Sequence, residues 1–263
     1  MDVTFMSFNL RYNEIQDGEN AWPYRVEKVA EVIRSHEPLV IGTQEGLHPM
    51  LLDMEQSLPQ YGFIGEGRYG GQQDEHNAIW YDKEQITPVE SGQFWLSEQP
   101  SQPGSISWNS SLPRICTWAR FQFIKGASNE FIVFNTHLDH ESEEAQVNGI
   151  RLVRQQMEER FRKRPLPMVL MGDFNSTPDS PVLDVLHSNP DGSLLSLTDA
   201  YTAAAGKVGP TFHDFKGGED GEAIDYIFVS SDVRVMATKV IREQINGRYP
   251  SDHYPVAARV SMN

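Results

Sequence analysis

The sequence predicts an α/β protein in which two packed β-sheets lie between outer helices. Strand-like and helix-like segments alternate along all 263 residues, without a linker, a low-complexity tract or a repeat of solenoid length. Helices follow the early and central strands, whereas the remaining strands succeed one another directly. This mixed order favours a layered sandwich, and we expect residues 1–263 to form a single domain.

The N-terminal half begins with a strand over residues 2–9. A helix is predicted over residues 22–35, because Val26, Val29 and Ile33 fall on one face and Pro38 follows its end. The following segments have strand or helix patterns bounded by Gly-rich turns. They are strands at 39–44, 61–68, 78–82 and 87–97, and a helix at 47–58.

The C-terminal half contains the clearest helix, over residues 141–163. Acidic side chains at its start and basic side chains at its end suit the helix dipole, so the basic run needs no binding role. Strands at 117–125 and 130–138 should form a hairpin with residues 126–129 as its loop. The remaining elements are strands at 168–174, 223–229, 233–241 and 255–260, and a short helix that opens at Ser180 and Pro181.

Composition limits the classes of function. The formal net charge of −15 disfavours a protein that grips long nucleic acid through its phosphates, so we expect no stable binding to duplex DNA. No apolar run approaches the ~20 residues that span a bilayer. The N-terminus enters a strand at Val3, so we expect a cytoplasmic protein unless a leader has been removed. Cys116 is the only cysteine, which excludes an internal disulfide. We also expect a monomer.

Four apolar runs end abruptly in polar side chains. The runs end at Asn9, at Glu45, at His137, and at the pair Asp173 and Asn175. A buried strand reads as a continuous hydrophobic run, and its C-terminal end is a rigid mounting point at a sheet edge. Asp, Glu, Asn and His are the side chains that bind a hard cation and move protons. The sequence therefore predicts one polar cluster above a sheet.

Three short motifs add to this pattern. In Gly172-Asp173-Phe174-Asn175 the Asp and Asn are two apart, so both face the same side of an extended segment. Asp252 and His253, at the start of the last strand, offer a carboxylate for a metal and an imidazole for a phosphate or a proton. Asp225 lies inside an apolar run, which is costly unless a partner such as histidine is present. Each motif alone also reads as a turn, a cap or a core residue, but their ordered combination indicates a site.

In this order, the motifs resemble those of the endonuclease/exonuclease/phosphatase superfamily of metal-dependent phosphoesterases, in a minimal, bacterial-type form. The resemblance covers nearly the whole chain, from Asn9 to Pro255. It implies a four-layer αββα sandwich similar to that of pancreatic deoxyribonuclease. The motifs are specific for the superfamily and poorly specific for the substrate.

The resemblance implies a metal site. Glu45 looks like the principal Mg²⁺ ligand, with Asn9 beside it completing or orienting the site. Asp252 resembles an additional metal ligand. Mg²⁺ takes one or two carboxylates and keeps several waters, which these residues satisfy, and Mn²⁺ could substitute for it.

The resemblance also implies catalytic roles. Asp173 looks like the residue that positions and activates the attacking water, and Asn175 like the Asn that holds the scissile phosphate. His253 resembles the histidine that contacts the phosphoryl oxygens, with Asp225 as its buried partner. His137 matches a histidine of the branches similar to pancreatic-type deoxyribonucleases, sphingomyelinases and deadenylases, which disfavours the abasic-site endonuclease branch.

These roles predict an Mg²⁺-dependent hydrolase of a phosphate ester, with a phosphodiester preferred. An in-line attack needs a positioned water, a cation and donors around the equatorial oxygens. The substrate stays open between a phosphorylated small molecule or lipid headgroup and a single-stranded RNA or DNA end cleaved 3′ to 5′, as in deadenylases. A non-catalytic scaffold of the same fold is a third, less favoured reading.

Several weaker candidates surround these motifs. Arg114, just before a strand, could clamp a substrate phosphate bidentately or be an ordinary surface arginine. Trp95 and Trp108 could form an aromatic wall for the leaving group, although aromatic core is the default interpretation. Tyr12 and Asn13 are candidate substrate contacts by position only.

Overall fold

Two mixed β-sheets pack face to face in the computed structural model, which describes residues 2–125, 129–189, 193–204 and 208–262. In these residues each sheet has six strands. The first sheet has the order β13 (Val233–Val240), β14 (Val256–Met262), β1 (Asp2–Asn9), β2 (Val40–Gln44), β6 (Ile79–Asp82), β4 (Tyr61–Ile64). The second has the order β11 (Leu197–Asp199), β12 (Asp225–Ser230), β10 (Met168–Asp173), β9 (Glu130–His137), β8 (Ile115–Phe123), β7 (Ile86–Trp95).

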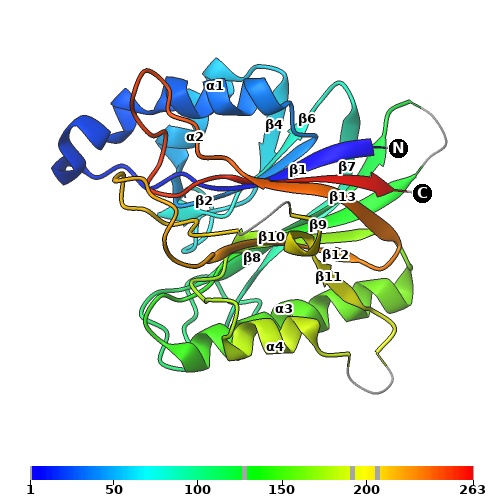
Figure 1. The fold of residues 1–263 in the computed structure, drawn as a ribbon. Helices are drawn as coiled ribbons and strands as arrows, with labels where there is room; N and C mark the ends of the chain where they lie inside the picture. Colours follow the sequence, from blue (N-terminus) through cyan, green and yellow to red (C-terminus); the bar gives the residue numbers. More distant parts are fainter. Residues whose placement is uncertain (1, 126–128, 190–192, 205–207, 263) are drawn as a thin grey trace.

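Helices cover the outer face of each sheet. The helices α1 (Val26–His36) and α2 (His48–Ser57) lie on the first sheet, and α3 (Glu143–Lys163) and α4 (Pro181–His187) lie on the second. Figure 1 shows the resulting four layers in the order helix, sheet, sheet, helix. The αββα sandwich predicted from the sequence is therefore confirmed. No helix of the described residues is long and apolar enough to cross a membrane.

Aromatic and aliphatic side chains fill the space between the sheets. Phe131 packs its ring against Phe5 of the first sheet, with 5.8 Å between centroids, and against Phe121 of the second. The sheets approach closely at Gly42, where an added Cβ would lie 2.7 Å from Met171 Cγ and 2.8 Å from Asn135 Cγ. Burial of this apolar surface fixes the two sheets, and hence their edges, relative to each other.

Strand register aligns the polar strand ends. The parallel pair β1 and β2 places Asn9 opposite Gln44, one residue before Glu45. In the second sheet, β9 and β10 are parallel and place Asp173 opposite His137. The antiparallel partner β12 places Asp225 on the other side of Asp173. Because the period of a strand is two residues, this register decides which side chains face the cleft.

Some expected elements are wrong in their bounds. The helix expected at 22–35 is a 3₁₀ turn, η2 (Trp22–Tyr24), followed by α1, and the buried guanidinium of Arg25 donates to nearby carbonyls at the junction. The strand expected at 61–68 ends at Ile64, because the chain turns at Gly65 with a φ of 136°. The sequence analysis did not identify the short ribbon of β3 (Gly46–Leu47) and β5 (Glu75–His76), nor the strand β11, nor the 3₁₀ turns η1 (Ile15–Asn20) and η3 (Ala200–Ala203).

The predicted hairpin of the second sheet is present, because β8 and β9 pair in antiparallel register. Its strands are Ile115–Phe123 and Glu130–His137 rather than 117–125 and 130–138. Residues 126–128 of the expected loop lie outside the described residues. The long helix begins at Glu143, where the Ser142 side chain accepts from the N–H of Ala145 and caps it.

Candidate active site

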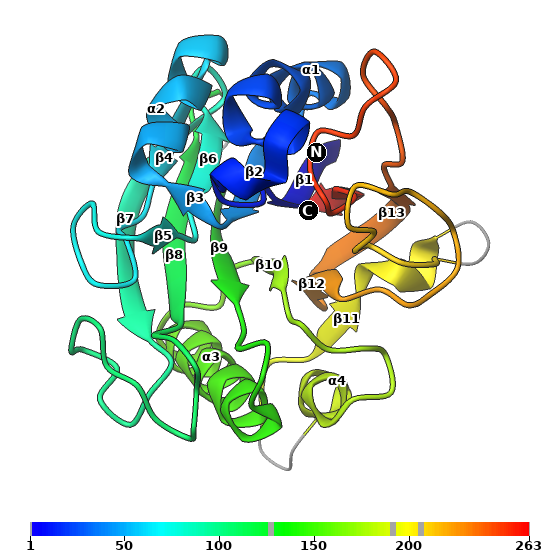
Figure 2. The same cartoon turned by 90° about the vertical axis from the view of Figure 1, so that its left-hand side faces the viewer.

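A cleft of about 810 Å³ opens at one end of the sandwich, above the ends of strands from both sheets. Figure 2 looks onto this end, with the β3–β5 ribbon on one side of β9 and β10, and β12 and β13 on the other. Its walls include seven residues that the sequence analysis singled out as site residues. They are Glu45, Arg114, His137, Asp173, Asn175, Asp252 and His253.

Asn9 joins the two halves of the site from behind the cleft wall. Its Nδ2 donates to Glu45 Oε1 at 2.9 Å and to Asp173 Oδ2 at 2.9 Å. Its Oδ1 accepts from the backbone N–H of Arg11 at 2.9 Å, which fixes the orientation of the amide. The second oxygen of Glu45 accepts from the backbone N–H of Tyr12 at 3.0 Å. One buried amide therefore sets the positions of two carboxylates that come from different sheets.

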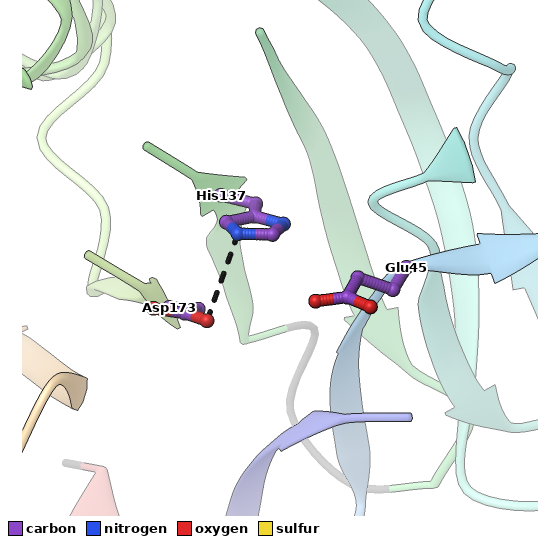
Figure 3. A group of neighbouring side chains, drawn as sticks. All are labelled: Glu45, His137 and Asp173. Atoms are coloured by element: carbon purple, nitrogen blue, oxygen red, sulfur yellow. Dashed lines mark ion pairs between the residues drawn. The ribbon is translucent and has the colours of Figure 1, made fainter. Parts of the chain in front are cut away.

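Two histidines flank Asp173. His253 Nε2 lies 3.7 Å from Asp173 Oδ2, and His253 Nδ1 lies 2.8 Å from Asp225 Oδ2. His137 Nε2 lies 3.6 Å from the same Asp173 oxygen, and Figure 3 shows the Glu45 and Asp173 carboxylates turned toward the space in front of this ring. The amide of Asn175 donates to His137 Nε2 at 3.0 Å. With Nε2 as the acceptor, the proton of a neutral imidazole would sit on Nδ1, which is buried without a hydrogen-bond partner among the described residues.

Burial and neighbouring charges shift the pKa values of these groups. Burial, with a further contribution from Asp225, raises the pKa of Asp173 to about 7. Burial alone lowers the pKa of His253, but the charge and hydrogen bond of Asp225 outweigh it and raise the pKa to about 10. Burial and the nearby Arg114 and His253 lower the pKa of His137 well below its ordinary value. The site thus pairs a charged histidine with a neutral one.

The carboxylates fit a hard divalent cation. Single ligand atoms of Glu45, His137 and Asp173 all lie within 4.8 Å of one another. Asp252 lines the same cleft. Burial raises the pKa of Asp252 above its ordinary value; the charge of His253 lowers it, and the charge of Glu45 raises it further. Crowded carboxylates repel one another unless a proton or a cation lies between them, and oxygen-rich sets of this kind suit Mg²⁺ or Mn²⁺. Glu45, His137 and Asp173 lie close enough to share one cation, and Asp252 is a further carboxylate of the same cleft.

Other predicted residues have clear structural partners. Asp225 lies buried behind the cleft, where it faces His253. Arg114 is buried, with its Nε 3.4 Å from Asp139 Oδ2 and its Nη2 2.8 Å from His140 Nδ1. Arg114 therefore reaches the cleft wall in a fixed position, rather than as a mobile surface side chain. Asn135 bonds to the Gln44 side chain and to backbone carbonyls, as structural support between the sheets.

Trp95 and Trp108, for which an aromatic wall was the alternative to aromatic core, are not part of the described cleft lining. Trp95 is buried, and its indole N–H donates to the carbonyl of Arg68 at 2.6 Å. The aromatic side chains of the cleft are instead Tyr12 and Phe212. The Phe212 ring packs edge-on against the His253 ring, with 5.1 Å between centroids.

Sequence analysis missed several charged residues of the cleft. They are Arg11, Arg68, Asp74, Glu75 and His140. These residues lie in loops or in a two-residue strand, where charge is ordinary and carries no periodic signal. Only the folded chain brings them beside the strand ends.

The family model described as "Endonuclease/Exonuclease/phosphatase family" matches residues 6–253 of this chain. The chain belongs to this family. As an endonuclease/exonuclease/phosphatase family protein it is a hydrolase that acts on phosphate esters, and family members generally use divalent metal ions. Among curated proteins, no match was found.

Solved structures similar to this endonuclease/exonuclease/phosphatase protein include a family member from Bacteroides vulgatus, with 36% identity, a TM-score of 0.92 and 100% of each chain covered. A mannosyl-6-phosphatase from Bacteroides thetaiotaomicron has 34% identity and a TM-score of 0.90, with 99% of this chain and 100% of that chain covered. The human Nocturnin catalytic domain with bound sulfate has 19% identity and a TM-score of 0.75, with 100% of this chain and 94% of that chain covered. That last likeness concerns the fold alone.

Proposed function

We propose that this protein is an Mg²⁺-dependent phosphoesterase that hydrolyses a small phosphorylated molecule by in-line attack of water. The observation that carries the proposal is the link through Asn9, which holds Glu45 and Asp173 together beside His137 and His253. Such a site combines a cation-binding carboxylate, a candidate base and donors for a phosphoryl group.

Asp173 is the residue we assign to the attacking water. Its Oδ1 accepts from the N–H of Asn175 at 2.9 Å, and its Oδ2 accepts from Asn9. These bonds fix the carboxylate, and its raised pKa makes it a stronger base than an exposed aspartate. It can therefore orient a water and accept the proton that the water loses on attack.

His253, Asn175 and His137 are the residues we assign to the phosphoryl group. Asp225 keeps His253 protonated, so Nε2–H offers a charged donor to a phosphoryl oxygen. The Asn175 amide lines the same cleft, and one of its N–H groups, which here donate to His137 Nε2 and to the Leu138 carbonyl, would turn to a phosphoryl oxygen when substrate binds. His137 is neutral and lines the cleft beside them, so it can contact the phosphoryl group without adding charge.

Glu45 and Asp252 are the residues we assign to Mg²⁺, and Asn9 is a positioning residue for Glu45. When bound, Mg²⁺ supplies neutralisation of the charge that develops on the phosphoryl oxygens. Asn9 uses its Nδ2 on the two carboxylates and its Oδ1 on a backbone N–H, so its hydrogen-bonding groups are already committed. That arrangement supports orientation over direct ligation.

For the substrate, we propose the phosphate monoester of a sugar. The similar chain from Bacteroides thetaiotaomicron is a mannosyl-6-phosphatase with 34% identity over nearly its whole length. The net charge of −15 also favours a small ligand over a polyanion. The sequence alone favoured a diester. Neighbours with nucleic-acid ligands, such as a zebrafish (D. rerio) TDP2 with single-strand DNA product at 16% identity, share only the fold.

An activity panel tests this proposal. Mannose 6-phosphate, 4-nitrophenyl phosphate, bis(4-nitrophenyl) phosphate, poly(A) and single-stranded DNA would each be assayed with Mg²⁺ and with EDTA. We expect Mg²⁺-dependent phosphate release, fastest from the sugar phosphate. Asp173→Ala should lower kcat by about 10²–10⁴-fold, whereas Asp184→Ala, on the exposed side of α4, should leave it unchanged. An Asp173→Ala protein as active as wild type would remove Asp173 from its assigned role.

A further inference from the structure

One wall of the cleft is built by the segment between β4 and β6. Its strand β5 pairs with β3, so that His76 lies opposite Gly46 and Glu75 lies opposite Leu47. Gly46 and Leu47 directly follow Glu45 along the chain. The backbone ladder therefore fixes Glu75 at a set distance from the proposed metal ligand, although the two residues are thirty positions apart in sequence.

Arg68 completes this wall. Its guanidinium Nη2 lies 2.9 Å from Glu75 Oε1 and 2.7 Å from Asp74 Oδ1, and its backbone N–H donates to the carbonyl of Glu75. The residue is only 8% exposed, and its carbonyl accepts from the indole of Trp95. Its Nε is buried without a hydrogen-bond partner among the described residues. A buried guanidinium with an unused N–H is costly unless a ligand or water completes it.

The proposed reaction has no use for this pair. Asp173, His137 and His253 act on the phosphoryl group, and Glu45 and Asp252 serve the cation. Arg68 and Glu75 line the same cleft on the side built by the β3–β5 ribbon, with Arg114 also on the cleft wall. They are thus placed to meet the part of the substrate that carries the phosphate, rather than the phosphate itself.

The charge of the wall indicates what it binds. Arg68 faces two carboxylates, and burial together with the nearby Glu45 raises the pKa of Glu75 to about 7, so the group of Arg68, Asp74 and Glu75 has no net positive charge with which to attract a second phosphate. A neutral hydroxyl group suits this wall, because a hydroxyl can donate to the carboxylate of Glu75 while accepting from the guanidinium of Arg68. Adjacent hydroxyls of a sugar ring present both functions together.

We infer that Arg68 and Glu75 form a subsite for the hydroxyl groups of a sugar phosphate, which makes them specificity-determining residues. The inference rests on the proposed function, since it assumes that a phosphate ester is cleaved in this cleft. Sites built to bond a hydroxyl reject analogues that lack it, because their buried polar groups are then left unpaired. The protein should accordingly prefer sugar phosphates to phosphate esters whose leaving group has no hydroxyl.

The test compares two substrates across matched variants. Arg68→Met and Glu75→Gln keep side-chain size while removing charge, and kcat and KM would be measured with Mg²⁺ on mannose 6-phosphate and on 4-nitrophenyl phosphate. Glu130→Gln is the control, because Glu130 also pairs with an arginine, Arg120, at 2.6 Å, but outside the cleft. Melting temperatures of all proteins would show whether each variant is folded.

We expect both cleft variants to lose at least about tenfold more kcat/KM on mannose 6-phosphate than on 4-nitrophenyl phosphate, equivalent to about 1.4 kcal/mol of lost selectivity. Most of the loss should appear in KM, and Glu130→Gln should show no such difference. Equal losses on the two substrates would assign the pair to loop structure and overturn the inference. A wild-type protein that cleaves 4-nitrophenyl phosphate but no sugar phosphate would also overturn it, whereas inactivity on both substrates would instead contradict the proposed function.

Discussion

At the scale of single residues, the site depends on buried polar groups that satisfy one another. Asn9 bonds to Glu45, Asp173 and the backbone of Arg11, and Asp225 bonds to His253. Each of these side chains is costly to bury alone and stable when paired. The sequence singled out Asn9, Glu45, His137, Asp173 and Asp225 because each ends or interrupts an apolar run. It did not predict that the Asn9 amide would bridge two carboxylates.

Glu45 provides the first prediction, which concerns metal binding. Mg²⁺ at about 100 times its Kd should raise the melting temperature of the wild type by about 5–10 °C, because a ligand of the folded state stabilises it. Glu45→Gln should lose most of this rise, since it removes a charged oxygen ligand. Differential scanning fluorimetry with Mg²⁺ and with EDTA measures this rise in melting temperature, and Glu130→Gln serves as the control. A full Mg²⁺ effect in Glu45→Gln would argue against Glu45 as a ligand.

Asp225 provides the second prediction, which concerns pH. The Asp225 carboxylate raises the pKa of His253 to about 10. The ionised pair therefore stabilises the fold fully at pH values below the ordinary histidine pKa of about 6.5. This stabilisation is lost as the pH rises toward 10. If charged His253 is needed, wild-type kcat/KM should fall only near pH 10. In Asp225→Asn the fall should move down by at least about one pH unit.

The pH profile of kcat/KM tests this second prediction. Asp199→Asn, on the neighbouring strand β11 and bonded to the N–H of Tyr201 instead of a histidine, is the control. An Asp225→Asn profile that coincides with that of the wild type would show that Asp225 does not set the charge needed for the reaction.

At the scale of elements, strand register positions the site. The parallel pair β9 and β10 places Asp173 opposite His137 and Gly172 opposite Thr136. An added Cβ on Gly172 would lie 1.9 Å from the carbonyl oxygen of Thr136. The sequence predicted both strands from their apolar runs. It predicted α3 to within two residues at its start, because an apolar stripe and acidic side chains at the first turn are local signals.

Gly172 provides the third prediction. Gly172→Ala should lower the free energy of unfolding by about 1–3 kcal/mol, because the methyl group collides with backbone that cannot rotate away. Activity should fall as well, since Asp173 and His137 would move apart. Urea unfolding followed by circular dichroism measures the first effect. Gly149→Ala is the control, because its added Cβ would meet side chains instead of backbone, with Leu96 Cδ1 at 3.2 Å and Leu138 Cδ2 at 3.6 Å. Equal stability of the two variants would contradict the prediction.

At the scale of the whole molecule, the chain ends meet in one sheet. β1 pairs with β14 over residues 2–7 and 256–261, and the two sheets share one apolar interface. Neither sheet keeps its inner face buried without the other. The single domain expected from a chain without linkers stays a prediction, which the unfolding behaviour of the protein can test.

The fourth prediction follows from this shared interface. Thermal unfolding should be one cooperative transition, with a calorimetric enthalpy about equal to the van't Hoff enthalpy. Differential scanning calorimetry in EDTA makes the measurement without a metal contribution. Two resolved transitions, or a calorimetric enthalpy well above the van't Hoff value, would show that the sheets unfold separately.

The sequence by itself determined the α/β class, most strand positions and the motif residues from Asn9 to His253. These are local properties, because hydrophobic period and an interrupting polar side chain are visible within a few residues. Only the tertiary structure decided that Arg68, Glu75 and His140 line the cleft, that Trp95 does not, and that Asn9 joins the sheets. Their places depend on strand register, on a two-residue ribbon and on loops, which are fixed by contacts between segments far apart in the chain and leave no periodic pattern in the sequence.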